Sequence, residues 1–243
     1  MRKGWKSERD KKMNKTKIEY LDYTDNPIVG CSGVGCAVRK VCWARGQAKR
    51  AKHRCSLCYD FVPHVHFERF DGPLKVKNPS RIGYCFMGDF FDKQISEAIR
   101  RQLKDVMRMA YWHTFVVFTK QPQNIDLDEY IPANMWVGVS VNHQKDDWRI
   151  DVLRQVPTSV RIVSFEPLYE HIEADLMNIQ WVIIGAQRRP NHQPKQDWVV
   201  QLVRSARVFG SAVFLKNNLF PQPMAEHYQE YPKLVTYEEL MCS

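Results

Sequence analysis

The chain has 243 residues, of which 44% are hydrophobic and 26% are charged. This balance is typical of a folded domain and excludes a wholly disordered chain. No apolar run reaches the roughly 20 residues that a membrane-spanning helix needs, and the basic N-terminus leads into no signal-peptide core. We therefore expect a cytoplasmic protein with no membrane contact.

The net charge of +9 is concentrated in two segments. Residues 1–17 hold eight Lys or Arg against two acids, so we expect a basic, disordered tail there and a single domain over residues 18–243. Residues 26–59 hold seven Lys or Arg, all between positions 39 and 54, and no acid. Such a field attracts nucleic acid, a phosphate-bearing substrate or an anionic cluster, and charge alone does not choose among them.

Short apolar runs predict a series of strands. One is expected at 27–30, and six clearer runs lie at 82–87, 114–119, 135–141, 160–165, 181–184 and 212–215. Apolar residues at helical spacing predict one helix between residues 95 and 110 and a second that begins at Asp197 and ends near Gly210. Alternating strands and helices predict βαβ units and a parallel sheet. The expected fold class is α/β, with a partial or complete TIM-like barrel.

Hydrogen-bonding or ionisable residues follow each of the six clear runs. In a parallel barrel the carboxyl ends of the strands meet at one mouth, where active sites lie. The alternative is a doubly wound open sheet, but no G-x-G-x-x-G turn follows a strand here. The candidate site residues at these ends are Gly88, Asp89, Lys120, Ser140, Asn142, Glu166, Gln187 and Lys216.

Five of the seven cysteines lie between Cys31 and Cys58, inside an expected Cys-rich loop insertion over residues 30–66 that follows the first strand. Thiolates from Cys31, Cys36 and Cys42 could hold three irons of a four-iron cluster and leave the fourth iron open for a ligand. The same three could instead hold zinc with a fourth ligand from elsewhere. Glycines between them allow tight backbone turns around such a centre.

A second ligand pattern begins at Cys55 and Cys58, which His64 and His66 follow. These are ligand types of a structural zinc site, although the His-x-His spacing is tighter than usual. The alternatives are a reduced thiol pair and additional ligands for the cluster. Cys85 is expected to be a small buried hydrophobic residue, and Cys242 is assigned no role.

The order of motifs from about Ile18 to Asn218 resembles the phage gene product 37/68 family, whose members are largely a domain of unknown function. The residues that carry the resemblance are Asn26–Cys31, Gly35-Cys36, Cys42-Trp43-Ala44, Met87–Phe91, Phe118–Pro122, Val137–Val141, Val163–Leu168, Trp181–Gly185 and Phe214–Lys216. The resemblance implies a radical-SAM-like partial TIM barrel with an iron–sulfur cluster at its mouth.

Two features depart from that pattern. Radical SAM enzymes generally space their cysteines C-x3-C-x2-C, whereas four and five residues separate the cysteines here. Relatives tend to show a carboxylate where Gln187 stands. Binding of a cluster survives both changes more easily than cleavage of S-adenosylmethionine.

The leading hypothesis is an enzyme that depends on a 4Fe-4S cluster, S-adenosylmethionine and an electron donor. Asp89 would meet the cofactor's ammonium group or a ribose hydroxyl. Lys120 and Lys216 would meet carboxylate or phosphate oxygens, and Glu166 would act as a polar anchor or proton acceptor. The alternative is a non-catalytic zinc- or cluster-containing nucleic-acid binder, and an enzyme acting on nucleic acid combines the two. An ordinary metal-bound barrel ranks last, because no His stands at any of the six strand ends.

Overall fold

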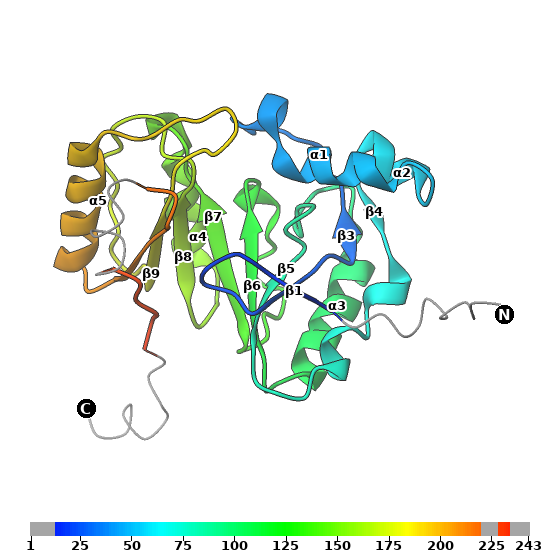
Figure 1. Ribbon diagram of the computed structural model, residues 1–243. Helices are drawn as coiled ribbons and strands as arrows, with labels where there is room; N and C mark the ends of the chain where they lie inside the picture. The colour runs from blue at the N-terminus through cyan, green and yellow to red at the C-terminus, as the bar shows by residue number, and fades with distance from the viewer. Residues whose placement is uncertain (1–12, 220–227, 234–243) are drawn as a thin grey trace, which may run out of the picture.

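The structure is a computed structural model that describes residues 13–219 and 228–233 (Figure 1). Its main sheet has eight strands in the order β1-β2-β5-β6-β7-β8-β9-β10, and all neighbours pair in parallel except β1 with β2. The strands are β1 (Asn14–Lys15), β2 (Tyr23–Asp25), β5 (Arg81–Tyr84), β6 (Thr114–Thr119), β7 (Met135–Ser140), β8 (Arg161–Phe165), β9 (Trp181–Ile184) and β10 (Ala212–Leu215).

Strands β5 to β10 form where short apolar, β-branched-rich runs predicted them. Such runs suit strands that are covered on both faces, and all six residues of β7 are buried. Strand β5 ends at Tyr84, earlier than expected, because Cys85 adopts a left-handed backbone with φ of 63°. Cys85 is buried, as expected for a small hydrophobic residue.

The helices of the barrel lie on one side of the sheet. Buried residues of α3 (Glu97–Met109), α4 (Trp148–Gln155) and α5 (Gln196–Val208) join one core cluster with residues such as Val117 and Val163. The opposite face of the strands forms a second, aromatic-rich cluster that contains no helix residue among those described, and that includes Tyr20, Trp136, Trp181 and Phe214. A doubly wound sheet carries helices on both faces, so this arrangement is barrel-like.

The barrel does not close within the described residues. Strand order follows the chain from β2 to β10 without reversal, and β1 and β10 lie at opposite edges. The edge of β10 is bordered by the segment around Gln229, which bridges Phe214 in antiparallel fashion. The fold is thus an open, TIM-like α/β sheet, which confirms the predicted class in its partial form.

Residues 27–66 form a separate layer at the carboxyl edge of the sheet (Figure 1). It contains α1 (Trp43–Ala48), α2 (Ser56–Asp60) and a two-stranded antiparallel sheet of β3 (Ile28–Val29) and β4 (His64–Val65). The expected strand at 27–30 therefore forms, but it pairs with β4, and the first parallel strand of the barrel is instead β2. Short 3-10 helices complete the chain: η2 (Arg39–Val41), η3 (Lys49–Ala51), η4 (Phe67–Arg69), η5 (Pro73–Lys75), η6 (Pro122–Asn124) and η7 (Gln144–Asp146).

Three other expectations concern the chain ends and helices. Residues 1–12 of the expected tail and Cys242 lie outside the described residues, whereas Asn14 and Lys15 form β1. Helix α5 begins at Gln196, and Asp197 lies in its first turn rather than at its N-cap. Over the described ranges, no helix has the length and hydropathy needed to cross a membrane.

Candidate functional site

The side chains that follow β5, β6 and β7 form one hydrogen-bonded row along the carboxyl edge of the sheet. Asp89 is buried, and its carboxylate accepts hydrogen bonds from the Thr119 hydroxyl at 2.7 Å and the Lys120 amide at 3.0 Å. The Lys120 Nζ atom in turn donates to the Ser140 hydroxyl at 3.1 Å. Burial raises the pKa of Asp89, and these hydrogen bonds oppose the shift. The row fixes three neighbouring strand ends relative to one another.

Glu166 and Lys216 form an ion pair between the ends of β8 and β10. Gly185, at the end of β9, lies between them, and a Cβ atom at that position would stand 3.0 Å from carbons of both side chains. Lys216 Nζ also lies 3.8 Å from a carboxylate oxygen of Glu19. The absence of a side chain at Gly185 therefore lets a charged pair bridge over the intervening strand.

Asn142 and Gln187 occupy the same edge but are held by different partners. Asn142 is fully buried, and its amide nitrogen donates to the Pro167 carbonyl at 2.8 Å. Its Oδ1 atom is buried and has no hydrogen-bond partner among the described residues, so it keeps a free acceptor position. Gln187 accepts a hydrogen bond from Tyr169 and donates to the Pro190 carbonyl at 2.9 Å.

Residues 30–42, here called the cluster loop, carry Cys31, Cys36 and Cys42 and are fixed to the strand ends at three points. Gly30 forms a parallel bridge with Gly88, and its amide donates to the Met87 carbonyl at 3.0 Å. The Ser32 amide donates to Asp92 at 2.6 Å. The Gly35 carbonyl accepts from Arg149 at 3.0 Å. Each contact is made by a residue directly beside Cys31 or Cys36.

Asp92, Gln121 and Arg149 are site residues that the sequence did not reveal. Asp92 is fully buried and also accepts from the Gln121 amide at 3.2 Å. Arg149 is buried, forms an ion pair with Asp146 at 3.0 Å, and donates to the Ser140 carbonyl at 2.7 Å. Asp92 directly follows the Met87–Phe91 motif, and Gln121 lies within the Phe118–Pro122 motif, so the signal available for these two residues was their place in or beside those motifs.

The three thiols of the cluster loop line one pocket of about 90 Å³, together with Arg39 and Arg45. Burial is the largest cause that raises the pKa of Cys31 to about 11. Gly33 and Gly35, with φ of 67° and 63°, turn the backbone around this pocket. Three sulfur ligands beside tight backbone turns and two guanidinium groups suit an anionic iron–sulfur cluster.

The two cysteine patterns differ in how closely their ligand atoms gather. Within the described residues, Cys55, Cys58, His64 and His66 are the group of metal-binding side chains whose ligand atoms all lie within 4.8 Å of one another. The cluster loop forms no such group. A single zinc ion on Cys31, Cys36 and Cys42 is therefore not favoured, whereas a cluster, which is larger than one ion, accepts more widely spaced sulfurs.

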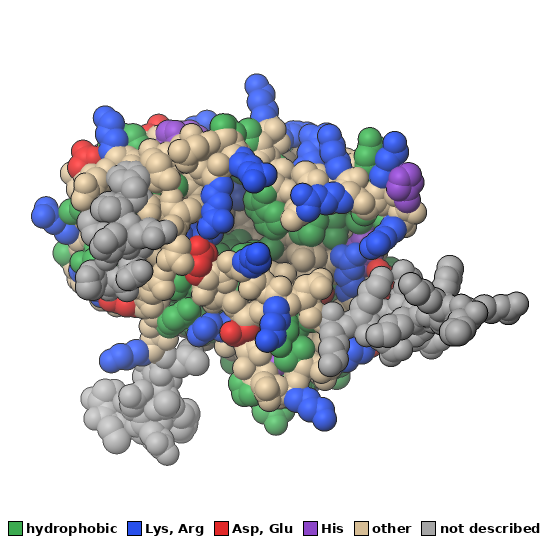
Figure 2. Space-filling view, in the orientation of Figure 1, with side chains coloured by type: hydrophobic (Ala, Val, Ile, Leu, Met, Phe, Trp, Pro, Cys, Tyr) green, Lys and Arg blue, Asp and Glu red, His purple; other side chains and the backbone are tan. Residues whose placement is uncertain are grey.

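The predicted basic stretch lies on the surface around this pocket. All seven Lys and Arg residues between 39 and 54 are exposed. Figure 2 shows Lys and Arg side chains gathered over α1 and α2 and around the adjoining hollow. Trp43, next to Cys42, exposes 56% of its surface. Exposed cations beside an aromatic ring suit phosphate contact and base stacking.

Comparison with known proteins gives a family and a fold. The model of the family described as "Protein of unknown function (DUF5131)" matches residues 15–227. No curated protein matches the chain. A solved structure of spore photoproduct lyase complexed with dinucleoside spore photoproduct is 13% identical, covers 84% of this chain and 79% of its own, and has a TM-score of 0.55.

A variant of the same lyase with bound AdoMet and dinucleoside spore photoproduct has a TM-score of 0.50 at 13% identity. That match covers 81% of this chain and 64% of the variant. At this identity the likeness shows a shared fold, and the chemistry has to be argued from the residues of this chain.

Proposed function

The chain belongs to the DUF5131 family of proteins of unknown function, and we propose that it is an iron–sulfur enzyme of the radical SAM kind. Cys31, Cys36 and Cys42 hold a 4Fe-4S cluster whose fourth iron is left for S-adenosylmethionine. The observation that carries the proposal is the attachment of the cluster loop to the strand ends at Gly30, Ser32 and Gly35. The resemblance of its motifs to the phage gene product 37/68 family suggests a phage-related protein.

The attachment matters because a redox centre must stand close to the bond that it breaks. When bound, the cluster and S-adenosylmethionine supply reductive cleavage of a carbon–sulfur bond, with the electron coming from an external donor. The chain's own contribution is to fix the thiols at the mouth of the barrel, where substrates of such folds bind. A solved structure with the same fold binds AdoMet, which is consistent with this arrangement.

The strand-end residues would bind and orient the cofactor. Gly88 leaves space beside the cluster loop, since a Cβ atom there would approach the Gly30 carbonyl to 3.0 Å. The free Oδ1 atom of Asn142 would accept a hydrogen bond from the cofactor, and Asp89 and Ser140 line the same edge. Gln187 offers an amide where a carboxylate would bind an ammonium group more strongly.

Asp89, Lys120, Glu166 and Lys216 are the candidate catalytic residues. Lys120 Nζ keeps donor capacity beyond its single hydrogen bond with Ser140, so it can bind a carboxylate or phosphate oxygen. The Glu166–Lys216 pair offers a carboxylate and an ammonium group that can form hydrogen bonds with a bound polar group. These roles are proposed because the side chains follow strand ends and carry charged groups, and substitution of each residue tests its role.

The proposed substrate class is a nucleic acid or another phosphate-bearing molecule. Arg39 and Arg45 line the cysteine pocket, and the remaining cations of residues 39–54 are exposed on the same insertion. The solved structures with this fold bind a dinucleoside photoproduct, which is a nucleic-acid fragment. A non-catalytic nucleic-acid binder is not favoured, because binding alone would not require the cluster loop to be fixed to the strand ends.

The experiment is anaerobic incubation of the reconstituted protein with dithionite and S-adenosylmethionine, followed by measurement of methionine release. The proposal predicts release that depends on protein, reductant and iron. The Cys36→Ala variant should release none, whereas Cys85→Ser, which changes a buried thiol outside the pocket, should retain the activity if it folds. Equal release by Cys36→Ala and the parent protein would refute the ligand assignment.

A further inference from the structure

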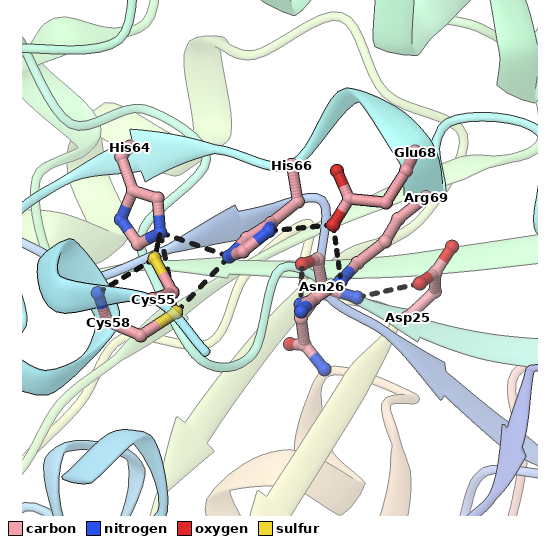
Figure 3. A network of polar contacts seen from close by, with 8 residues as sticks. All are labelled: Asp25, Asn26, Cys55, Cys58, His64, His66, Glu68 and Arg69. Atoms are coloured by element: carbon pink, nitrogen blue, oxygen red, sulfur yellow. Dashed lines mark hydrogen bonds and ion pairs between the residues drawn. The ribbon is translucent and has the colours of Figure 1, made fainter. Parts of the chain in front are cut away.

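We infer that Cys55, Cys58, His64 and His66 bind a structural zinc ion that is separate from the cluster. Figure 3 shows the two sulfur atoms and the two Nε2 atoms pointing toward a common centre. The Cys58 sulfur lies 3.4 Å from His64 Nε2 and 3.2 Å from His66 Nε2, and the Cys55 sulfur lies 3.4 Å from His64 Nε2. The two Nε2 atoms are 3.0 Å apart.

These distances match the edges of a small tetrahedron. With Zn–S near 2.3 Å and Zn–N near 2.0–2.1 Å, tetrahedral geometry places sulfur about 3.6 Å from nitrogen and the nitrogens about 3.4 Å apart. The four pairs measured here would need to separate by only a few tenths of an ångström to admit the ion. Two thiolates and two imidazoles are also a common ligand set for structural zinc.

The outer contacts of both imidazoles fix their ligating nitrogen. His64 Nδ1 donates to the Val62 carbonyl at 2.8 Å, and His66 Nδ1 donates to the Glu68 carboxylate at 2.8 Å. A neutral imidazole that donates through Nδ1 carries a lone pair on Nε2. Two such lone pairs face each other across 3.0 Å, which is repulsive unless a cation lies between them. The ring orientations therefore support a metal more than a plain thiol pair.

The zinc site would brace the cluster loop from the side. His64 pairs with Val29 in the small sheet, and the His66 amide donates to the Pro27 carbonyl at 2.7 Å. The Val62 carbonyl that accepts from His64 lies against Gly30, where a Cβ atom would approach its oxygen to 2.3 Å. Gly30 precedes Cys31, so a metal-bound His64 helps to fix the first cluster ligand.

A second line of contacts leads from the same site to the end of β2. Glu68 lies between His66 and Arg69, 3.7 Å from the Arg69 Nε atom (Figure 3). Arg69 donates to the Asn26 carbonyl at 2.8 Å, and the Asn26 side chain accepts from the Met87 amide at 2.8 Å. Met87 precedes Gly88, which bridges Gly30. Zinc would thus hold residues 55–66 against the segments that follow β2 and β5, and these segments position Cys31.

Zinc binding releases two protons from the site. Two thiols lose their protons to solvent as they become thiolates, and the two imidazoles bind as neutral groups through Nε2. The site then carries a formal charge of zero, which suits its half-buried position between α2 and β4.

The test is the zinc and iron content of the whole chain, purified anaerobically from cells supplied with both metals and measured by mass spectrometry. We expect about one zinc per chain. Zinc should be lost in His66→Ala and Cys55→Ser and retained in His53→Ala, whose exposed histidine lies in the same insertion. X-ray absorption at the zinc edge of the parent protein should show two sulfur and two nitrogen ligands, which keeps the proposal testable if a variant fails to fold.

Iron content tests the proposed cluster and zinc content tests the zinc site, so the two proposals can fail independently. Cys36→Ala should lose iron but keep zinc, whereas parent protein without iron but with zinc would overturn the cluster proposal alone. A parent protein without zinc would overturn the zinc site. Zinc bound through more than two sulfurs, or retained equally in His66→Ala and Cys55→Ser, would also overturn the assignment.

Discussion

The guanidinium of Arg149 donates a hydrogen bond of 3.0 Å to the carbonyl of Gly35, a residue 114 positions earlier in the chain. Through its other terminal nitrogen, Nη1, Arg149 donates a hydrogen bond to the Ser140 carbonyl at the end of β7. A buried side chain of α4 therefore connects the residue before Cys36 to the carboxyl edge of the sheet. This connection fixes the cluster loop to the edge of the sheet at which we propose the active site.

Arg149→Met should separate the cluster loop from the sheet. The change leaves the buried Asp146 without its ion-pair partner, which costs about 3–5 kcal/mol when a buried pair is broken. Iron content should fall together with the melting temperature. Lys145→Met, which changes an exposed residue of η7, is the matched control and should alter neither. A variant with lower stability and a full iron complement would show that Arg149 supports the fold alone.

Asp92→Ala tests the second attachment of the loop. The substitution leaves the amides of Ser32 and Gln94 without their acceptor, at a cost of about 1–3 kcal/mol for each amide that remains buried. We expect lower iron retention during anaerobic gel filtration than in the parent protein. Asp128→Ala, at an exposed position, serves as control. Identical iron retention in both variants would contradict a role for Asp92 in holding Cys31.

Asp25 gives the stability a pH dependence. Burial, opposed by the Asn26 amide and Arg69, raises its pKa from 3.8 to about 7, and its Oδ2 atom has no hydrogen-bond partner in the part of the chain that the structure describes. The folded state therefore binds a proton that the unfolded state has released, so this group lowers stability as pH rises from about 4 to about 7. Asp25→Asn should weaken that dependence and raise the melting temperature at pH 8.

Thermal unfolding at several pH values between 5 and 8 measures this effect. Asp105→Asn, at an exposed position on α3, should keep the dependence of the parent protein. If the melting temperatures of the parent protein and the Asp25→Asn variant changed by the same amount between pH 5 and 8, Asp25 would not be the source of the pH dependence.

Contact with nucleic acid should depend on Arg45, which lines the cysteine pocket. Affinity for a single-stranded oligonucleotide should fall steeply with salt, and Arg45→Ala should reduce the slope of that dependence by about one. Arg108→Ala, on the exposed side of α3, should leave the slope unchanged. Fluorescence anisotropy over a salt series is the measurement, and binding that is absent or insensitive to salt would argue for a smaller anionic substrate.

The sequence predicted the sheet because its strands are buried on both faces and therefore read as continuous apolar runs. Strands β6, β9 and β10 lie within the expected limits. Strand β2 was missed because it has only three residues, Tyr23–Asp25, and carries no apolar run. Residues 27–30 have the composition of a buried strand, and no local pattern shows that they pair with β4.

Part of the candidate site could be predicted because its residues follow strands or share a ligand type. Lys120 directly follows one apolar run and Asp89 comes two residues after another, and the structure brings the two together at the carboxyl edge of the sheet. Cys55, Cys58, His64 and His66 were singled out by residue type, and their ligand atoms gather in the structure. Arg149 and Asp92 could not be found in that way, because the contacts that join them to the cluster loop are with backbone atoms of Gly35 and Ser32, far along the chain. A hydrogen bond to a carbonyl or amide leaves no signature in the sequence of the partner residue.

The proposed cluster is tested most directly by electron paramagnetic resonance of the anaerobically purified, reduced protein, with and without S-adenosylmethionine, together with its iron and sulfide content. We predict about four irons per chain and a spectrum that changes when the cofactor is added, since an open iron would bind it. A protein that retains zinc but takes up no iron after reconstitution, and gives no signal on reduction, would contradict the proposed cluster.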